Sequence, residues 1–173
     1  DTIAPRFLTS AVLAAIDQRR RTGSGHTIEA AQLECGLQLM TPELLNFQTN
    51  GIKATRIGNR DFQIAPQGIY PVQGDDRWIG ITIANNDNWL ALRAIMGQPE
   101  WAMDKRYETV VGRMEAADFL DQQIAEWTDG LEGQALENTL LRGGIPAGLI
   151  ARSSDLLSDP QYDHLGFYRW HEH

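Results

Sequence analysis

Apolar side chains recur every three or four positions near the start of the chain, at Ile3, Phe7, Leu8, Ala11, Val12, Ala15 and Ile16. This spacing predicts an amphipathic helix. Pro5 suits its first turn, and Gly23 can end it in a left-handed conformation. Three arginines, Arg19 to Arg21, would lie in the last turn, where cations interact favourably with the helix dipole.

The next segments continue the helical character up to Asn50-Gly51, a sequence typical of a helix end. Residues 26–29 predict a short strand. Residues 30–40 are apolar on nearly all sides and therefore predict a buried helix. Thr41-Pro42 is typical of a helix start, so a second short helix is expected to follow.

The pattern changes after Gly51, where alternation with a period of two replaces the helical period. Ile79, Ile81 and Ile83 alternate with smaller or more polar residues, which predicts a strand over residues 78–84 with one buried face. Residues 68–72 predict its partner strand, because the intervening Gly74-Asp75-Asp76 has the composition of a turn. A short extended piece is expected at residues 60–65.

The rest of the chain predicts helices and one more short strand. A helix over residues 88–96 would be capped by Asp87, and the apolar stripe of residues 107–127 predicts one long amphipathic helix. Another helix is expected at residues 131–141 and a strand at residues 146–151. Ser153 or Ser154 would cap a last short helix before Asp159-Pro160.

These elements form two blocks. Residues 1–50 are helical and have no sheet of their own, so we expect them to belong to a larger core, whereas residues 51–173 read as an α+β unit followed by the start of a connecting segment. The length of 173 residues suits one domain, or a small domain with a piece of another.

Composition and charge limit which binding partners and which cellular compartment are expected. The net charge is −8, from 23 acidic and 15 basic residues, and such a surface repels nucleic-acid phosphates. No apolar run approaches the ~20 residues that span a bilayer, so no membrane partner is expected. The single cysteine, Cys35, lies among leucines and is predicted to be a buried bystander in a reducing, cytoplasmic compartment. No targeting segment is visible, and because the sequence does not begin with methionine we expect further residues before Asp1.

Few residues are candidates for chemistry. Asp1 precedes the first helix, so it is either a capping residue or a carboxylate nucleophile that the helix N-terminus keeps ionised and accessible. His26 is interpreted as structural. The four ligand-type side chains near the end suggest a metal site only superficially, because no scaffold precedes them, and none is predicted; they are His164, His171, Glu172 and His173.

Several short motifs occur in a fixed order along the chain. The chain carries an Asp that opens a helix, Arg-Arg-Arg-Thr-Gly-Ser-Gly at residues 19–25, and Leu33-Glu34 at the start of the next helix. Downstream it has Arg-Ile-Gly-Asn at residues 56–59, Pro-Gln-Gly-Ile-Tyr at residues 66–70 and Gly-Ile-Pro-Ala-Gly at residues 144–148. Taken in this order, these motifs resemble family III of the CoA-transferases, the CaiB/BaiF group. One departure is His26, which stands where that family usually has Gln.

The resemblance implies an α/β parent protein with a Rossmann-like large domain, an α+β small domain and two subunits interlocked as rings. Residues 1–50 would be the C-terminal helical part of the large domain, and residues 51–173 the small domain with the start of a return linker. The sheet that contacts the CoA nucleotide would then lie outside this chain, and the 173 residues alone are expected to be inactive.

The resemblance also assigns a role to Asp1, which matches the family's nucleophile. It implies transfer of CoA from an acyl-CoA thioester to a carboxylic acid through an aspartyl anhydride and an aspartyl-CoA thioester, with CoA as substrate and no tightly bound cofactor. The alternative is an α-methylacyl-CoA racemase of the same superfamily. Racemases carry a catalytic Glu where Asn86 stands here, which disfavours this alternative unless Asp87 replaces it.

Overall fold

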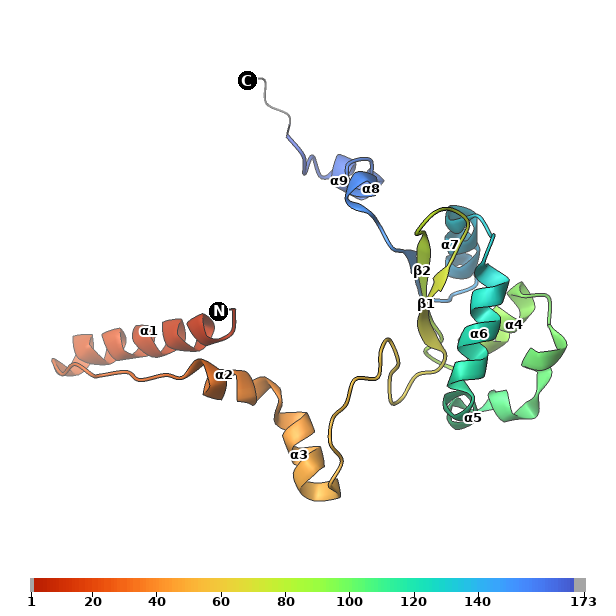
Figure 1. The fold of residues 1–173 in the computed structure, drawn as a ribbon. Coiled ribbons are helices and arrows are strands. Elements are labelled where there is room, and N and C mark those ends of the chain that lie inside the picture. The colour runs from red at the N-terminus through yellow and green to blue at the C-terminus, as the bar shows by residue number, and fades with distance from the viewer. Residues whose placement is uncertain (1, 170–173) are drawn as a thin grey trace. The chain divides into compact units, whose positions relative to one another are not determined.

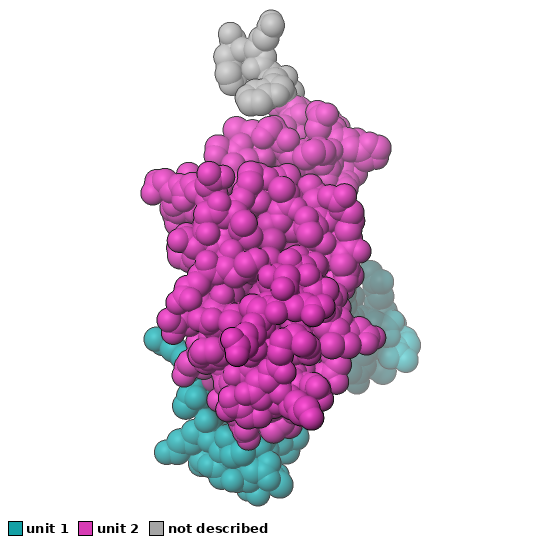
Figure 2. All heavy atoms as spheres, turned by 90° about the vertical axis from the view of Figure 1, so that its right-hand side faces the viewer, with its two compact units in different colours: residues 1–56 teal, residues 57–173 magenta. Residues whose placement is uncertain are grey.

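The computed structural model describes residues 2–169. The chain divides into two compact units, unit 1 (Asp1–Arg56) and unit 2 (Ile57–His173), drawn in teal and magenta in Figure 2. Among the described residues, no helix combines the length and the apolar character needed to cross a membrane.

The described residues of unit 1 form three helices joined by irregular chain (Figure 1). They are α1 (Ala4–Thr22), α2 (Gln32–Leu39) and α3 (Thr41–Asn50). The predicted end of α1 is confirmed: Gly23 has a φ of 76°, and its N–H donates to the Arg19 carbonyl at 2.9 Å. Glycine adopts this left-handed conformation without the steric penalty that a Cβ would bring.

Two predictions about unit 1 are wrong in this structure. Residues 26–29 form no strand, because a strand needs a partner for its backbone groups and the described part of unit 1 has none. The helix expected to be buried, α2, is exposed, with Leu33 75% accessible and Leu39 62%. Its apolar character is real, but unit 1 supplies no surface that covers it.

Unit 2 is built on a three-stranded antiparallel sheet in the order β1-β2-β3. The strands are β1 (Gln67–Pro71), β2 (Trp78–Thr82) and β3 (Ala147–Leu149). The predicted alternation is confirmed, because Ile79, Ile81 and Ile83 are at most 2% exposed. Ile69 and Trp78 point to the opposite face and remain partly exposed, so the sheet is covered on one side only.

Helices cover the buried face of the sheet and connect its strands (Figure 1). The helices between β2 and β3 are α4 (Asn86–Ile95), the 3₁₀ turns η1 (Glu100–Met103) and η2 (Lys105–Glu108), α5 (Val110–Glu115), α6 (Ala117–Thr128) and α7 (Gly133–Arg142). Two short helices follow β3, namely α8 (Ser153–Leu156) and α9 (Pro160–His164). Helix α6 packs on β1, and α7 packs on β3. The core between the layers includes Trp89, Leu92, Leu120, Ile124 and Leu140, each at most 1% exposed, and burying side chains of this size stabilises the fold by about 1.5–3 kcal/mol each.

The long helix predicted for residues 107–127 is interrupted. Tyr107 belongs to η2, and the Thr109 hydroxyl caps a new helix, α5, by accepting from the Gly112 N–H at 3.1 Å. Ala116 leaves the helical conformation before α6 begins. The apolar period continues across both breaks, so it could not reveal them.

Two predicted caps also differ from the structure. The side chain of Asn85, not Asp87, caps α4, with its Oδ1 accepting from the Asn88 N–H at 2.9 Å. Neither Ser153 nor Ser154 caps α8, because both lie inside the helix. There the Asp155 carboxylate accepts from the Arg152 N–H at 2.8 Å instead.

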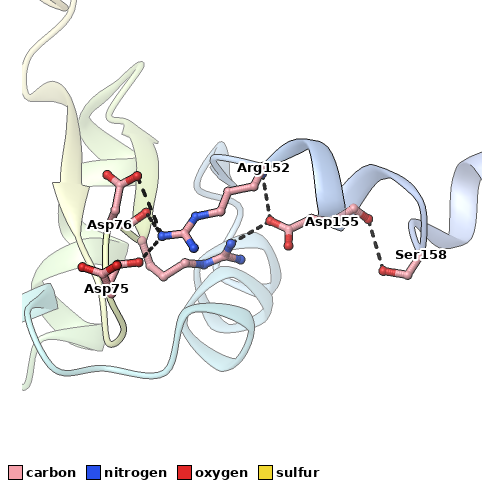
Figure 3. Close-up of polar contacts among 6 residues, drawn as sticks. Asp75, Asp76, Arg152, Asp155 and Ser158 are labelled. Carbon is pink, nitrogen blue, oxygen red and sulfur yellow. Dashed lines mark hydrogen bonds and ion pairs between the residues drawn. The ribbon is translucent and has the colours of Figure 1, made fainter.

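The segment that follows β3 is tied to the turn between β1 and β2 (Figure 3). The Arg152 guanidinium donates to the carbonyls of Asp75 and Asp76, the latter at 2.9 Å. Asp155 pairs with Arg77 at 2.7 Å. Helix α8 is therefore held to the β1–β2 turn by two arginines, which we call the α8 latch.

Candidate functional site

Asp1, the predicted nucleophile, lies outside the described residues, but the helix that follows it is well defined. Helix α1 begins at Ala4, and no described side chain caps its N-terminus or places a carboxylate in its first turn. The first N–H groups of a helix have no partner within the helix, and the helix dipole places partial positive charge there. The amino end of α1 can therefore stabilise an anionic group beside it.

Unit 2, taken by itself, contains a cavity of about 180 Å³. Its walls come from the segment around and between the motifs at residues 56–59 and 66–70, from the start of β1 and from helices α5 and α6. The lining residues are Ile57, Arg60, Asp61, Phe62, Ile64, Ala65, Pro66, Gln67, Met114, Ala117 and Asp121. The Gln67 side chain donates to the Asn59 carbonyl at 2.9 Å. The motifs at residues 56–59 and 66–70 thus meet around one hollow.

A charged network closes one side of this cavity. The Arg60 guanidinium binds Asp118 and Asp121, the latter at 3.1 Å, and the Tyr70 hydroxyl donates to Asp121 at 2.8 Å. Burial, together with the negative charge of Asp121, raises the pKa of Tyr70 far above its usual value. Tyr70 therefore stays protonated, and the network joins the segment before β1 to the surface of α6.

Behind the cavity wall lies a buried cation, Arg113 of α5, which is 1% exposed. Its Nε donates to the Ala65 carbonyl at 2.7 Å. Its Nη1 donates to the Tyr107 carbonyl at 2.8 Å and to Asn86 Oδ1 at 3.0 Å. Burial lowers the pKa of Arg113, because a charged group is poorly solvated there.

The other residues considered from sequence do not gather into a site. His26 is exposed in irregular chain, Cys35 is half-buried on α2, and His164 is exposed at the end of α9. His171, Glu172 and His173 lie outside the described residues. Among residues 2–169, no three His, Cys, Asp or Glu side chains are close enough to hold a metal ion.

Asn86 occupies the first turn of α4, and its amide oxygen already accepts a hydrogen bond from Arg113. Asp87, the possible substitute for the racemase glutamate, is exposed beside it. An amide cannot exchange a proton near neutral pH as a carboxylate does. Asn86 is thus arranged to receive a hydrogen bond rather than to act as an acid or base.

Sequence reasoning missed the charged residues around the cavity. Arg60 and Asp121 are brought together by folding from positions 61 residues apart, and no local sequence pattern predicts such a pair. The buried position of Arg113 left only a weak sign in the sequence: this arginine lies three positions after Val110 and one before Met114, within an apolar stripe. An arginine on the core-facing side of a helix indicates a buried polar role.

Comparison with known proteins identifies the family. The sequence profile of CoA-transferase family III matches residues 1–173. A succinyl-CoA–D-citramalate CoA-transferase from Chloroflexus aurantiacus is 34% identical over 162 residues, which are 94% of this chain and 40% of that protein. A succinyl-CoA:mesaconate CoA-transferase from Haloarcula marismortui is 28% identical over 149 residues, or 86% of this chain and 36% of that protein.

A solved structure agrees with these sequence matches. The crystal structure of a CaiB/BaiF family protein from Brucella suis is 27% identical and has a TM-score of 0.78, covering 95% of this chain and 43% of that one. The chain thus spans about two fifths of the length of the relatives it matches. Unit 2 has the mixed α/β architecture expected of the small domain in this fold. The resemblance read from the sequence is confirmed, and the chain belongs to family III of the CoA-transferases.

Proposed function

We propose that this chain supplies the nucleophile of an enzyme that transfers CoA from an acyl-CoA thioester to a carboxylic acid. The observation that carries the proposal is the family match over residues 1–173, which includes Asp1 and both motifs of the unit 2 cavity. Relatives are named for succinyl-CoA as donor and for D-citramalate or mesaconate as acceptor. We therefore expect a CoA thioester as substrate and a dicarboxylic acid as acceptor, with no tightly bound cofactor.

The proposed chemistry begins at the Asp1 carboxylate. It attacks the thioester carbonyl carbon, the C–S bond breaks, and CoA leaves as thiolate, giving a mixed anhydride with Asp1. The thiolate then attacks the aspartyl carbonyl, releases the donor's carboxylate and forms an aspartyl-CoA thioester. The acceptor carboxylate next displaces CoA to form a second anhydride. Finally, thiolate attack on the acceptor's acyl carbon releases the new acyl-CoA and restores Asp1.

Two features support this role for Asp1. The amino end of α1 favours an ionised group, because no described side chain neutralises its partial positive charge. A carboxylate is a weak nucleophile in water, but positioning beside a bound thioester raises its effective concentration by orders of magnitude. The racemase alternative receives less support, since Asn86 stands in place of the glutamate and accepts from Arg113.

We also propose an assignment of the two units within a longer protein. Residues 1–50 would be the C-terminal helical part of a Rossmann-like large domain, and residues 51–173 the small domain with the start of a return linker. The enzyme would be an interlocked homodimer in the cytoplasm, without nucleic-acid or membrane partners. The 173 residues by themselves would be inactive, because the chain spans about two fifths of the length of its relatives.

The decisive experiment traps the intermediate in the whole protein that contains this chain. Incubation with succinyl-CoA and hydroxylamine should convert Asp1 to its hydroxamate, detected by peptide mass spectrometry. Asp1→Asn should abolish both the adduct and CoA transfer. Asp17→Asn is the matched control, because Asp17 lies on the same helix in an exposed ion pair with Arg21.

The two candidate reactions give different results in this assay. An active enzyme without an Asp1 adduct would refute the nucleophile role. Deuterium entering the α-carbon of a 2-methylacyl-CoA, without transfer of CoA, would select the racemase instead.

A further inference from the structure

Arg113 is buried in unit 2, and the described part of the chain supplies no compensating charge beside it. No carboxylate among residues 2–169 forms an ion pair with it. Its guanidinium carbon lies 5.7 Å from the centre of the Trp89 ring. Removing an ion from water costs several kcal/mol, and an apolar side chain of similar volume would fill the same space without that penalty. Packing alone therefore does not explain an arginine at this position.

The hydrogen bonds of Arg113 bring three separate segments to one point. Nε binds the carbonyl of Ala65, just before β1, while Nη1 binds Tyr107 of η2 and Asn86 of α4. The planar guanidinium offers donors in fixed directions, so it fixes the relative positions of its acceptors. A lysine has one nitrogen on a flexible stem and cannot reproduce this geometry.

One of these three segments is a wall of the cavity. Ala65 and Pro66 line it from one side, and Met114, the neighbour of Arg113 on α5, lines it from another. Pro66 is also tied to the sheet, because its carbonyl accepts from the Ile83 N–H at 3.0 Å. The wall is thus held to the sheet through Pro66 and to the helical layer through Arg113.

We propose that Arg113 is a positioning residue, which holds the wall formed by residues 65–67 and thereby sets the shape of the cavity for the acyl-CoA substrate. The proposal rests on the proposed CoA-transferase function for its link to substrate. Whether Arg113 holds the wall in place does not depend on that function, and the mobility of the wall can be measured on the 173-residue chain.

The first test measures the wall directly. Amide hydrogen exchange of residues 61–67 in the 173-residue chain should accelerate at least tenfold in Arg113→Met and less in Arg113→Lys. Leu140→Ala is the control, since Leu140 is fully buried in the same core but lies on α7, whereas the three acceptors that Arg113 binds lie before β1, on η2 and on α4. Exchange at wild-type rates in Arg113→Met, or equal acceleration in Leu140→Ala, would overturn the proposal.

The second test uses steady-state kinetics of the whole protein, well below the unfolding temperature of each variant. Arg113→Met should raise the KM for succinyl-CoA at least tenfold, with partial recovery in Arg113→Lys. Leu140→Ala should lose stability without a change in KM, because a purely structural defect reduces the folded fraction and not the affinity of the folded enzyme. If Arg113→Met does not fold, Arg113→Lys decides: a wild-type KM together with wild-type exchange would refute the positioning role.

The two proposals fail in different ways. A wild-type enzyme that forms no Asp1 hydroxamate would refute the proposed function and leave the exchange prediction standing. An active wild-type enzyme whose Arg113 variants keep their KM would refute the positioning role alone.

Discussion

A single methyl group at position 112 would collide with the backbone. A Cβ built on Gly112 would lie 1.9 Å from the Arg106 carbonyl oxygen, and a backbone atom cannot move aside as a flexible side chain can. We expect Gly112→Ala to destabilise unit 2 by about 3 kcal/mol, at the upper end for overpacking. Urea unfolding followed by tryptophan fluorescence measures this free energy.

Gly148→Ala is the matched control for this prediction. A Cβ there would meet only Glu137 Oε1, at an ordinary distance of 3.9 Å, so its effect should stay within about 0.5 kcal/mol. Equal stabilities of the two variants would show that η2 and α5 do not pack as closely as the structure places them.

Tyr70 makes the stability of unit 2 sensitive to pH in the alkaline range. An unfolded tyrosine ionises near pH ~10, whereas burial beside Asp121 raises the pKa of Tyr70 in the folded state. A raised pKa contributes stability that is fully present below the unfolded value and is lost as pH rises towards the folded value. Unfolding free energies between pH 8 and about 11 should therefore fall for the wild type.

Tyr70→Phe should weaken this loss of stability at alkaline pH. At neutral pH it should cost about 1 kcal/mol, because the hydrogen bond to Asp121 is gone. Tyr162→Phe in α9 removes a tyrosine outside this network and should keep the wild-type profile. A Tyr70→Phe profile that falls as steeply as the wild type would contradict the assigned cause.

At the scale of residues, the sequence shows the motifs that meet around the unit 2 cavity but not the contacts among the charged side chains there. The motifs at residues 56–59 and 66–70 could be recognised because each is a continuous stretch of sequence, whereas the nucleophile role of Asp1 stays a prediction. The network of Arg60, Asp121 and Tyr70 could not, since its members lie up to 61 residues apart and meet only through the packing of α6 on β1. Long-range charge pairs carry no periodic signal.

At the scale of elements, the α8 latch should weaken in acid. The Arg152 N–H and the Arg77 guanidinium hold the pKa of the Asp155 carboxyl below its ordinary value. A depressed carboxyl pKa gives stability that is present above the unfolded pKa, near ~3.9, and is lost as pH falls through the folded pKa. Amides of residues 152–158 should therefore exchange faster, relative to the rest of unit 2, as pH falls below about 4.

Asp155→Asn should loosen α8 already at neutral pH. It removes the charge that Arg77 pairs with, so amide exchange in residues 152–158 should rise several-fold and lose its dependence on salt. The control is Asp163→Asn, because Asp163 of α9 takes no part in the latch. Unchanged protection in Asp155→Asn would mean that Arg152 alone holds α8.

The elements themselves could be predicted where the local pattern decides their structure. The alternation of Ile79, Ile81 and Ile83 predicted β2 because one face of the sheet is buried. The break between α5 and α6 could not be predicted, since apolar positions keep the helical period through Ala116. The prediction that α2 is buried was wrong because burial depends on a partner surface, which the sequence of the helix does not specify.

For the whole molecule, the two units should differ in how much apolar surface they expose. Unit 1 leaves large apolar side chains at least 38% exposed on all three helices and at the junction of α2 and α3, namely Phe7, Val12, Leu13, Ile16, Leu33, Leu37, Leu39, Met40, Leu44, Leu45 and Phe47. Clustered apolar surface of this kind binds hydrophobic dyes and promotes association. All five tryptophans lie at position 78 or later, so tryptophan signals report on unit 2 alone. The 173-residue chain should therefore bind the dye ANS while its near-UV circular dichroism shows a packed unit 2.

Replacing Leu13, Leu33 and Leu45 together with Ser should reduce ANS fluorescence at least twofold and leave the near-UV signal unchanged, because none of the three supports the core of unit 2. The comparison variant in unit 2, Ile69, Leu90 and Leu141 to Ser, removes side chains that are 44–54% exposed and should reduce the dye signal less. If the unit 1 variant instead binds ANS as strongly as the wild type, the apolar faces of α1 to α3 are covered in solution by a contact that the chain makes with itself or with a second copy.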